Sequence, residues 1–407
     1  MKFVIAPDSF KGSLTAKEAA TAMATGIKRV YPDAELTLVP MADGGEGTVQ
    51  SLVDATNGQL LIKTVHGPLN QPVQAHYGLL GNSNTAVIEM AEASGIGYVT
   101  EETKNPLIAT TYGTGELILD AVSHGVDQII IGIGGSATND GGAGMAQALG
   151  VKLLNDAGEQ VGLGGGALGE VAHVDVSGVD RRVKEVKVGL GGGALGEVAH
   201  VDVSGVDRRV KEVKVLIASD VTNPLTGPEG ASAVFGPQKG ATPEMVKLLD
   251  DNLHHYAAVI KADLGRDLEE KPGAGAAGGL GTGLLAFTNA TMQKGIELVV
   301  EYSQLEEQAA GADYVLTGEG SIDFQTKFGK TPYGVAKTTK RVAPQAPVIG
   351  IAGHLGKGVA ELANEGVIDT VFASPSGAKS LEQAIADAAQ DVALTAENVA
   401  RLIKVSH

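Results

Sequence analysis

The sequence predicts a soluble α/β protein of two domains, and three observations support this. At both ends of the chain, short apolar runs alternate with amphipathic helical segments, as in parallel sheets buried on both faces. In the middle, closely spaced strand-like segments are joined by Gly, Asn and Pro turns, which indicates antiparallel or mixed pairing. The length of 407 residues suits two domains of roughly 100–200 residues each.

The N-terminal segment predicts strand–helix–strand–helix. Residues 3–6 (FVIA) form the first strand and residues 35–39 (ELTLV) the second. Between them, Thr15 caps a helical stretch that Pro32 ends, and another helix follows the second strand to about Ala55. This alternation is the beginning of a parallel α/β sheet.

The middle of the chain changes pattern and then returns to alternation. Three strands are expected in close succession and a fourth farther on, at residues 60–65, 73–80, 85–90 and 128–131. Helices and strands alternate again from about Pro106.

The C-terminal third returns to the first pattern. Three short strands of the buried type are separated by helices, at residues 313–316, 348–351 and 370–373. A long Ala-rich amphipathic helix closes the chain. We therefore expect residues 1–58 and 296–407 to form one parallel-sheet domain, and residues 59–295 to form a mixed α/β domain inserted into it.

Charge and composition exclude several classes of partner. The net charge is −17 and no basic stripe counters it, so we expect no nucleic-acid partner. No apolar run approaches the roughly 20 residues that span a bilayer, so we expect no membrane partner. The first apolar run ends at Asp8, too short for a signal peptide, and the chain has no Cys. We expect a cytoplasmic protein, whose oligomeric state stays open.

One segment is repeated without change: residues 162–188 reappear letter for letter as residues 189–215. Evolved solenoid repeats diverge and need about three copies to bury a core, so two identical copies indicate a recent or engineered duplication. The second copy runs directly into the strand KVLIAS (214–219), whereas docking the first copy would split that strand. We predict that the second copy holds the native position and that the first forms an extra excursion.

Ligands of open parallel sheets bind beyond the carboxyl ends of the strands, and the loops expected there are unusually rich in charge. These loops are APDSFKGS, MADGGEGT, TGEGSID, AGHLG and ASPSG, and their charged residues include Asp8, Lys11, Asp43, Glu46, Glu319 and Asp323. Loops that only turned the chain would need Gly, Asn or Ser alone. The competing interpretation is that Asp8 and Asp43 merely cap the helices that follow them.

The middle region adds further candidates. IGIGGSATNDGG contains a loose G-x-G-x-x-A at Gly132, Gly134 and Ala137, which is a weak dinucleotide signal by itself. Asp220 follows an apolar strand, and Lys239 in FGPQKGAT is a candidate phosphate contact. Residues 273–283 contain six glycines in eleven positions, so their backbone N–H groups are candidates to bind phosphate oxygens. The alternative for this loop is a hinge or close helix packing.

These residue types favour phosphoryl transfer over other chemistry. The GKT at residues 329–331 is no P-loop because Phe324 stands where Gly is required, although Lys330 remains a candidate phosphate contact. Zinc is poorly supported, since the chain has no Cys and the adjacent His254 and His255 would point apart on a helix. Carboxylates with Gly-rich loops and scattered Lys suit Mg²⁺ carried with a nucleotide.

The sequence resembles the bacterial type I glycerate kinases. The matching blocks run in order along nearly the whole chain: IAPDSFKGSLTA, MADGGEGT, GIGGSATNDGGAGMAQALG, SDVTNPLTGPEGASAVFGPQKGAT, GAGAAGGLG, TGEGSIDFQT with GKTP, and IAGHLG. The resemblance implies a cytoplasmic enzyme that phosphorylates glycerate with ATP and Mg²⁺ in a cleft between a flavodoxin-like domain and an inserted domain. The family type implies 2-phosphoglycerate as product, which the residues themselves do not distinguish from 3-phosphoglycerate. It has room for one copy of the repeat, which would leave 407 − 27 = 380 residues.

Roles within this resemblance are hypotheses. Asp220 is our candidate for the base that takes the proton of the acceptor hydroxyl, with Asp43 as its rival. Asp8 and Glu319 are candidate Mg²⁺ ligands, and Lys11 is expected to neutralise phosphate or the glycerate carboxylate, as is Lys239. The residues expected to bind the nucleotide phosphates are Gly134, Gly135, Ser136, Gly273, Gly275, Gly278, Gly279 and Lys330.

Three alternatives stay open. The first is a kinase of another small hydroxy acid or sugar acid. The second is a dinucleotide-dependent oxidoreductase resting on Gly132 and Gly134, which lacks the acidic residue expected about 20 positions later. The third is a non-catalytic binding protein with a hinge between its domains.

Overall fold

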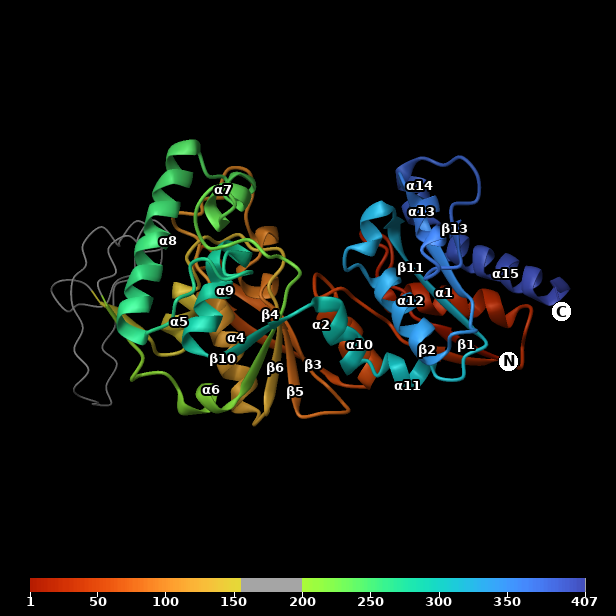
Figure 1. Ribbon diagram of the computed structural model, residues 1–407, viewed down its shortest axis with the longest axis horizontal. Coiled ribbons are helices and arrows are strands. Elements are labelled where there is room, and N and C mark those ends of the chain that lie inside the picture. Colours follow the sequence, from red (N-terminus) through yellow and green to blue (C-terminus); the bar gives the residue numbers. More distant parts are fainter. Residues whose placement is uncertain (155–199, 407) are drawn as a thin grey trace. The chain divides into compact units, whose positions relative to one another are not determined.

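The computed structural model describes residues 1–154 and 200–406, and the chain divides into two compact units (Figure 1). Unit 1 comprises Met1–Gln59, Leu80–Asn82 and Lys294–His407. Unit 2 comprises Leu60–Leu79 and Ser83–Gln293. The predicted α/β class is confirmed, since one sheet is parallel and another is mixed.

Unit 1 contains a five-stranded sheet in the order β13-β12-β11-β1-β2, in which every neighbouring pair is parallel. Its strands are β1 (Lys2–Ile5), β2 (Glu35–Leu38), β11 (Tyr314–Ile322), β12 (Val348–Leu355) and β13 (Thr370–Ala373). Its helices are α1 (Ala16–Lys28), α2 (Thr48–Thr56), α10 (Gly295–Tyr302), α11 (Leu305–Ala309), the 3₁₀ helix η4 (Phe324–Lys327), α12 (Thr331–Val342), α13 (Val359–Asn364), α14 (Leu381–Ala386) and α15 (Ala388–Ser406).

Two helices from opposite ends of the chain pack side by side on this sheet. Met23 of α1 and Ala396 of α15 are buried in one core with Phe3 and Ile5 of β1 (Figure 1). The capping box at Thr15 begins α1 as predicted: its hydroxyl accepts from the backbone N–H of Glu18. Helix α12 contacts β11, and α10 contacts both α12 and α2.

The strands predicted at the two ends of the chain are confirmed, with one difference. β11 and β12 continue beyond their predicted ends, because Glu319 pairs with Ala352 and the register runs on to Ile322 and Leu355. Glu319 was expected in a loop after the strand, and it instead lies inside β11. Gly318 and Gly320 of TGEGSID and Gly353 of AGHLG are therefore strand residues.

Unit 2 contains a six-stranded sheet in the order β10-β9-β6-β5-β4-β3 and a small antiparallel pair, β7 and β8. Strands β10, β9, β6 and β5 are parallel, and β4 runs antiparallel to β5. The strands are β3 (Gln59–His66), β4 (Pro72–Leu79), β5 (Thr85–Glu89), β6 (Gln128–Gly132), β7 (Lys152–Leu154), β8 (His200–Asp202), β9 (Lys214–Ala218) and β10 (Asn289–Gln293).

The α-helices of unit 2 share one core with its large sheet. They are α3 (Ala91–Ser94), α4 (Tyr112–Ser123), α5 (Ala143–Ala148), α6 (Arg208–Glu212), α7 (Ala231–Phe235), α8 (Pro243–Leu264) and α9 (Ala276–Phe287). Two 3₁₀ turns, η1 (Ile96–Tyr98) and η3 (Pro237–Lys239), contribute no side chain to this core. Leu117 of α4, Tyr256 of α8 and Leu280 of α9 are fully buried in it.

The second copy of the repeat supplies a strand of the large sheet. Its residues 200–215 form β8, α6 and the start of β9, where Lys214 lies opposite both Gln128 of β6 and Asn289 of β10. The predicted position of this copy is confirmed for these residues. The first copy, residues 162–188, lies outside the described residues, so the predicted excursion stays a prediction.

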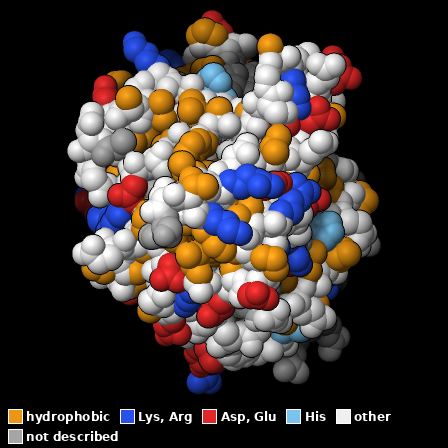
Figure 2. All heavy atoms as spheres, turned by 90° about the vertical axis from the view of Figure 1, so that its right-hand side faces the viewer, with side chains coloured by type: hydrophobic (Ala, Val, Ile, Leu, Met, Phe, Trp, Pro, Cys, Tyr) orange, Lys and Arg blue, Asp and Glu red, His pale blue; other side chains and the backbone are white. Residues whose placement is uncertain are grey.

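The surface of unit 1 carries apolar side chains on its last two helices. Leu381, Leu402 and Val405 are 78, 57 and 81% exposed. Figure 2 shows hydrophobic side chains interspersed with Lys and Arg on one face. Within residues 1–154 and 200–406, no helix combines the length and the apolar character that crossing a bilayer requires.

Candidate active site

Three carboxylates of unit 1 come from neighbouring strands of the parallel sheet. Asp8 follows β1, Asp43 follows β2, and Glu319 lies near the carboxyl end of β11. Because β1 lies between β2 and β11, the three side chains belong to one edge of the sheet. Asp43 and Glu319 each interact electrostatically with Asp8. We call Asp8, Asp43 and Glu319 the carboxylate cluster.

Asp8 is buried at the beginning of a helix from the other end of the chain. Its Oδ2 accepts a 2.7 Å hydrogen bond from the hydroxyl of Thr331, the first residue of α12. Its Oδ1 accepts a 2.6 Å bond from the backbone N–H of Ser9. Burial raises the pKa of Asp8 to about 6 against the Thr331 bond, and the charge of Asp43 adds to the rise. The N-cap of α1 is Thr15, so the interpretation that Asp8 merely caps this helix is wrong.

Glu319 is bonded to the segment that precedes α12. Its Oε1 accepts a 3.1 Å bond from the Thr326 hydroxyl and lies 3.3 Å from the ammonium of Lys330. The same ammonium donates to the carbonyl of Ser321 at 3.3 Å. Burial raises the pKa of Glu319 to about 7, while Lys330 and Thr326 oppose the rise and Asp8 adds to it.

The donor set of Asp8 and Glu319 fits a hard divalent cation. Both are carboxyl groups, and burial with like charge nearby raises the pKa of each. A bound cation would remove that penalty by favouring both ionised forms. Mg²⁺ is commonly held by one or two carboxylates together with substrate phosphates. Within the described ranges, no three or more His, Asp and Glu side chains are arranged to hold a metal ion by themselves.

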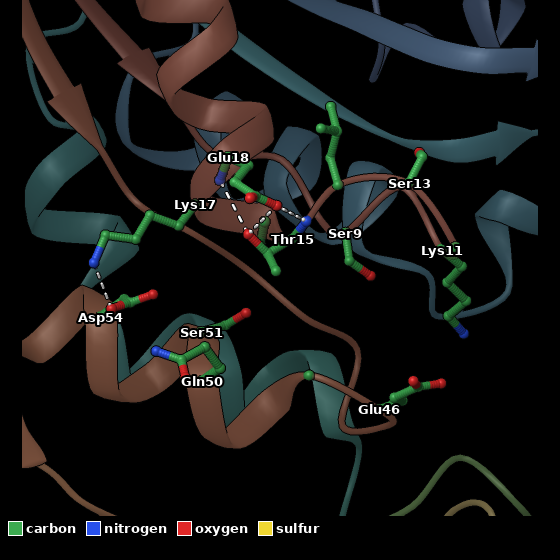
Figure 3. A pocket seen from close by; sticks show the side chains of 14 residues that line it. Ser9, Lys11, Ser13, Thr15, Lys17, Glu18, Glu46, Gln50, Ser51 and Asp54 are labelled. Atoms are coloured by element: carbon green, nitrogen blue, oxygen red, sulfur yellow. Dashed lines mark hydrogen bonds and ion pairs between the residues drawn. The ribbon is translucent and has the colours of Figure 1, made fainter. Parts of the chain in front are cut away.

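A pocket of about 310 Å³ is lined by residues that follow Asp8 and Asp43 in the sequence. It lies between the loop after β1 and the beginning of α2 (Figure 3). Ser9 and Lys11 line it from the loop, and Glu46 and Gln50 line it from the side of α2. The Lys11 ammonium interacts electrostatically with Asp8 and lowers its pKa. Lys11 therefore combines access to a pocket with closeness to a buried carboxylate.

In unit 2, the loop after β6 is held from two sides. On one side, the Ile96 N–H donates to the carbonyl of Gly135, and Gly95 forms a bridge with Ser136. On the other side, the Lys239 ammonium donates to Ser136 Oγ at 2.7 Å and to the Thr138 carbonyl at 2.6 Å. Gly134 and Gly135 are exposed, whereas Ser136 is 9% exposed.

Lys239 does not have the exposed position that a phosphate contact requires. It is 1% exposed, and burial lowers its pKa to about 7 although the charge of Asp140 opposes this shift. The sequence suggested a phosphate contact because Lys239 stands between two glycines in FGPQKGAT. The η3 turn instead directs the side chain into the unit, since Lys239 bonds the loop after β6.

Asp140 is a buried residue to which the sequence assigned no role of its own. Its Oδ2 accepts from the backbone N–H and the hydroxyl of Thr111, at 2.8 and 2.9 Å, and from Gly144 N–H at 3.2 Å. Its Oδ1 accepts from Gly142 N–H at 3.1 Å. Burial raises the pKa of Asp140 although these bonds oppose the rise. The only signal available was its place among polar residues directly after β6.

The Gly-rich loop at residues 273–283 packs closely against its own unit. A Cβ on Gly278 would lie 2.0 Å from the Thr138 carbonyl oxygen, and one on Gly275 would lie 2.1 Å from the carbonyl oxygen of Pro224. Gly279 faces Gly141 and Gly273 faces Met292 in the same way. Close packing, the alternative weighed from the sequence, thus explains these glycines, and their phosphate-binding role stays a prediction.

Asp220 lies two residues beyond β9, next to the strand that carries the loop at Gly134 and Gly135. Ala218 of β9 is in register with Gly132 of β6, so both segments leave the sheet at the same edge. Asp220 is exposed. The predicted residues of unit 2 are therefore brought to one sheet edge, except that Lys239 is buried beneath it.

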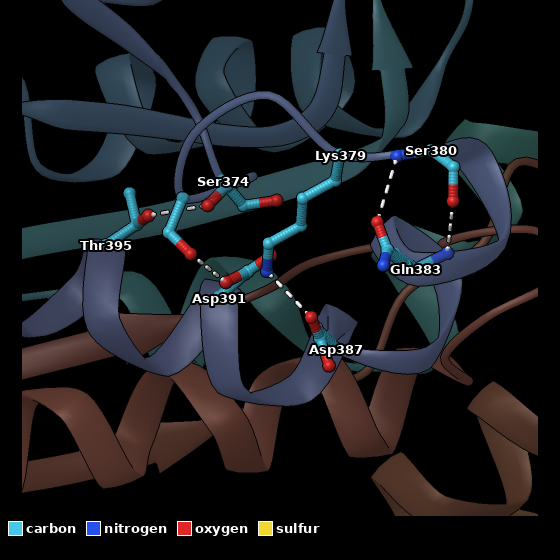
Figure 4. Close-up of polar contacts among 8 residues, drawn as sticks. Ser374, Lys379, Ser380, Gln383, Asp387, Asp391 and Thr395 are labelled. Atoms are coloured by element: carbon cyan, nitrogen blue, oxygen red, sulfur yellow. Dashed lines mark hydrogen bonds and ion pairs between the residues drawn. The ribbon is translucent and has the colours of Figure 1, made fainter.

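One further polar network follows β13 (Figure 4). Lys379 lies 2.9 Å from Asp387 and 2.7 Å from the 3% exposed Asp391, which also accepts a 2.6 Å bond from the Ser376 hydroxyl. Although burial opposes ionisation, Lys379 and Ser376 hold the pKa of Asp391 below its usual value. This network fixes the ASPSG loop, and the sequence pointed to the loop but not to these partners.

The chain is similar to known proteins along its whole length. The model of the Glycerate kinase family matches residues 3–190 and 186–404, two segments that overlap across the junction of the repeat copies. A "Glycerate kinase" of Bacillus subtilis is 49% identical over 406 residues, covering 100% of this chain and 98% of that protein. A "Glycerate 2-kinase" of Escherichia coli is 45% identical over 405 residues, covering 100% of this chain and 98% of that protein. A crystal structure from Salmonella typhimurium LT2, whose glycerate kinase 2 assignment is provisional, has a TM-score of 0.85 and 47% identity, covering 100% of this chain and 99% of that one.

Proposed function

This chain belongs to the glycerate kinase family and is a glycerate kinase, and from that premise we propose that it transfers the γ-phosphoryl group of ATP to the 2-hydroxyl of glycerate with the help of Mg²⁺. The 2-position is supported by the E. coli relative, which is called a 2-kinase. A cytoplasmic location remains a prediction from the sequence. The observation that carries the phosphoryl-transfer chemistry is the pair of the buried Asp8 and the partly buried Glu319, beside Lys11 and Lys330.

The roles in unit 1 follow from these contacts. Asp8 and Glu319 would hold Mg²⁺, which when bound neutralises phosphate charge and orients the transferring group. Lys330 pairs with Glu319 at 3.3 Å, and we propose that it exchanges this partner for a phosphate oxygen. Lys11, which lines the pocket after β1, would neutralise phosphate or the glycerate carboxylate.

The roles in unit 2 follow from the sheet edge. The exposed Gly134 and Gly135 leave backbone N–H groups accessible, and these with Ser136 would bind nucleotide phosphates. Asp220 would orient the acceptor hydroxyl and take its proton, with Asp43 of unit 1 as the rival base.

We propose that unit 1 corresponds to a flavodoxin-like domain made of both chain ends, and that residues 59–295 are an insertion. The strand order of unit 1 supports this, because counted along that unit it is 2-1-3-4-5.

The function is tested by ATP consumption with glycerate, with other hydroxy acids and sugar acids as competitors, and by NMR identification of the product. We expect glycerate to be preferred and 2-phosphoglycerate to form. A preferred sugar acid, or a 3-phosphorylated product, would overturn the corresponding part of the proposal.

The base is tested by replacing its two candidates separately. Asp220→Asn keeps size and removes the proton acceptor, so turnover should fall about 10²- to 10⁴-fold while the melting temperature is retained. Asp43→Asn is the matched variant. Near-normal turnover of Asp220→Asn with a collapse in Asp43→Asn would transfer the role to Asp43.

A further inference from the structure

Lys239 is a buried lysine of unit 2, and its ammonium bonds to the loop after β6. It ends the η3 turn, and Gly240 directly after it adopts φ = 92° beside Lys104. This left-handed position favours Gly, so the turn fixes where the preceding side chain enters the unit. At 1% exposure, Lys239 is among the largest fully buried side chains of the protein.

Burying the ammonium group of a lysine costs free energy, so we expect its hydrogen bonds at this position to offset that cost. Burial lowers the pKa of Lys239 to about 7, with Asp140 opposing the shift. Both of its bonds go to one loop, through Ser136 Oγ and the Thr138 carbonyl. An apolar side chain would fill the same space without the desolvation cost, but it would leave these acceptors without a donor.

The loop needs a tether on this side. Within the described residues, the buried Thr138 Oγ1 and Asn139 Oδ1 have no hydrogen-bond partner. Besides Lys239, the bond from Asn139 Nδ2 to Ser232 Oγ at 3.0 Å ties the loop to the α7–η3 segment. The exposed Gly134 and Gly135 lie only a few residues from both bonds, and without the Lys239 bonds this part of the loop would be held mainly from the side of Gly95 and Ile96.

We propose that Lys239 is a positioning residue, which holds the loop at residues 134–138 in the conformation that binds nucleotide phosphates and does not itself touch the substrate. This inference rests on the proposed phosphate-binding role of that loop. It replaces the direct phosphate contact expected for Lys239 from the sequence. It requires that Lys239 act through Ser136, and that its loss weaken nucleotide binding more than it weakens the fold.

The experiment compares Lys239→Met, Lys239→Gln and Ser136→Ala with Leu253→Ala. Leu253 is fully buried in α8 and serves as the control for loss of stability without loss of the tether. A displaced binding loop can cost about 10²-fold in rate, so we expect kcat/KM for ATP to fall about 10- to 100-fold in Lys239→Met, mostly through KM. Lys239→Gln, which retains an N–H donor, should recover part of this loss, and Leu253→Ala should change KM less than about twofold at a comparable loss of melting temperature.

The double variant Lys239→Met with Ser136→Ala tests whether the lysine acts through the serine. We expect Lys239→Met to cost less in the Ser136→Ala background than in the wild type. Full additivity would overturn the proposal, as would an equal rise of KM in Leu253→Ala.

Amide hydrogen exchange separates this inference from the proposed function. In the absence of substrates, Lys239→Met should speed exchange at residues 133–138 more than Leu253→Ala does. Unchanged exchange there would overturn the tether, whatever the enzyme's acceptor. Wild-type protein that does not phosphorylate glycerate with ATP would instead overturn the proposed function, while the exchange comparison would still decide whether Lys239 holds the loop.

Discussion

The hydroxyl of Thr331 donates a 2.7 Å hydrogen bond to the buried carboxylate of Asp8, across 323 positions of the chain. Thr331 begins α12, and Asp8 follows the first strand. The bond ties the beginning of a late helix to the carboxylate cluster, and it lowers the pKa of an Asp8 carboxyl that burial otherwise raises.

Replacing Thr331 by Val should destabilise the protein more at pH 8 than at pH 5. The bond stabilises ionised Asp8, whose pKa is about 6, so its loss leaves a buried carboxylate short of a donor at the higher pH. We expect a loss of about 1–3 kcal/mol in the free energy of unfolding at pH 8, measured by urea denaturation. Thr339→Val is the control, because that hydroxyl donates only to Val335 O within α12. Equal losses at the two pH values would contradict this role of Thr331.

The pH dependence of stability should have opposite signs at Asp8 and Asp391. The pKa of Asp8 is raised from 3.8 to about 6, so the folded protein holds this proton more tightly and its stabilising effect is lost as pH rises through 4–6. In the metal-free protein, the free energy of unfolding of Asp8→Asn relative to wild type should therefore rise by about 2–3 kcal/mol between pH 4 and pH 8. The pKa of Asp391 is lowered, so its contribution is present at neutral pH and lost in acid. Asp391→Asn should lower the free energy of unfolding most at neutral pH. Parallel curves for the two variants would refute at least one of the two assignments.

Mg²⁺ dependence should report on the carboxyl pair. Removing either ligand charge weakens a hard-cation site, so Asp8→Asn and Glu319→Gln should each raise the Mg²⁺ concentration for half-maximal activity by at least about 10-fold, equivalent to 1.4 kcal/mol. Asp391→Asn, which lies in the network after β13, is the control. An unchanged Mg²⁺ requirement in both cluster variants would remove Asp8 and Glu319 from the metal site.

Gly278→Ala and Gly265→Ala separate backbone strain from lack of space. The two glycines have φ angles of 70° and 66°, so Ala pays a similar cost of about 1–2 kcal/mol at both. A Cβ at Gly265 meets open space, whereas one at Gly278 would lie 2.0 Å from the Thr138 carbonyl oxygen. We expect Gly278→Ala to lose roughly 1–3 kcal/mol more than Gly265→Ala in chemical denaturation. Equal losses would show that the 273–283 loop is not tightly packed.

Deleting residues 162–188 should stabilise the protein and preserve its activity. The deletion shortens the connection between β7 and β8 from 45 to 18 residues. The loop-closure scaling then gives a gain in unfolding free energy of about 0.8 kcal/mol. The deletion leaves β9, which leads to Asp220, in its sequence context. The control replaces residues 162–188 by a Gly-Ser linker of equal length, to separate chain length from the duplicated sequence. A 380-residue chain that melts lower or turns over more slowly than the 407-residue chain would show that the first copy contributes to the enzyme.

Sequence patterns predicted much of the fold because they report on local structure. Short apolar runs identified the strands of the parallel sheet, and the Thr15 cap identified the start of α1. The rule that parallel strands end at a common edge placed Asp8 and Asp43 at one site, where the structure shows them interacting. The uninterrupted strand at residues 214–219 identified the repeat copy that enters the sheet.

What the sequence determined by itself is the order of elements, the parallel edge and the charged residues at that edge, since each follows from neighbours along the chain. Only the tertiary structure decided that Lys239, a phosphate-contact candidate from the sequence, is buried and bonded to Ser136, 103 positions away. The tertiary structure alone also decided the Thr331 bond to Asp8 and the packing of Gly278 against Thr138. Each depends on the distance between segments far apart in sequence, which is set by the packing of a whole unit, and burial then fixes the charge and the reach of the side chain.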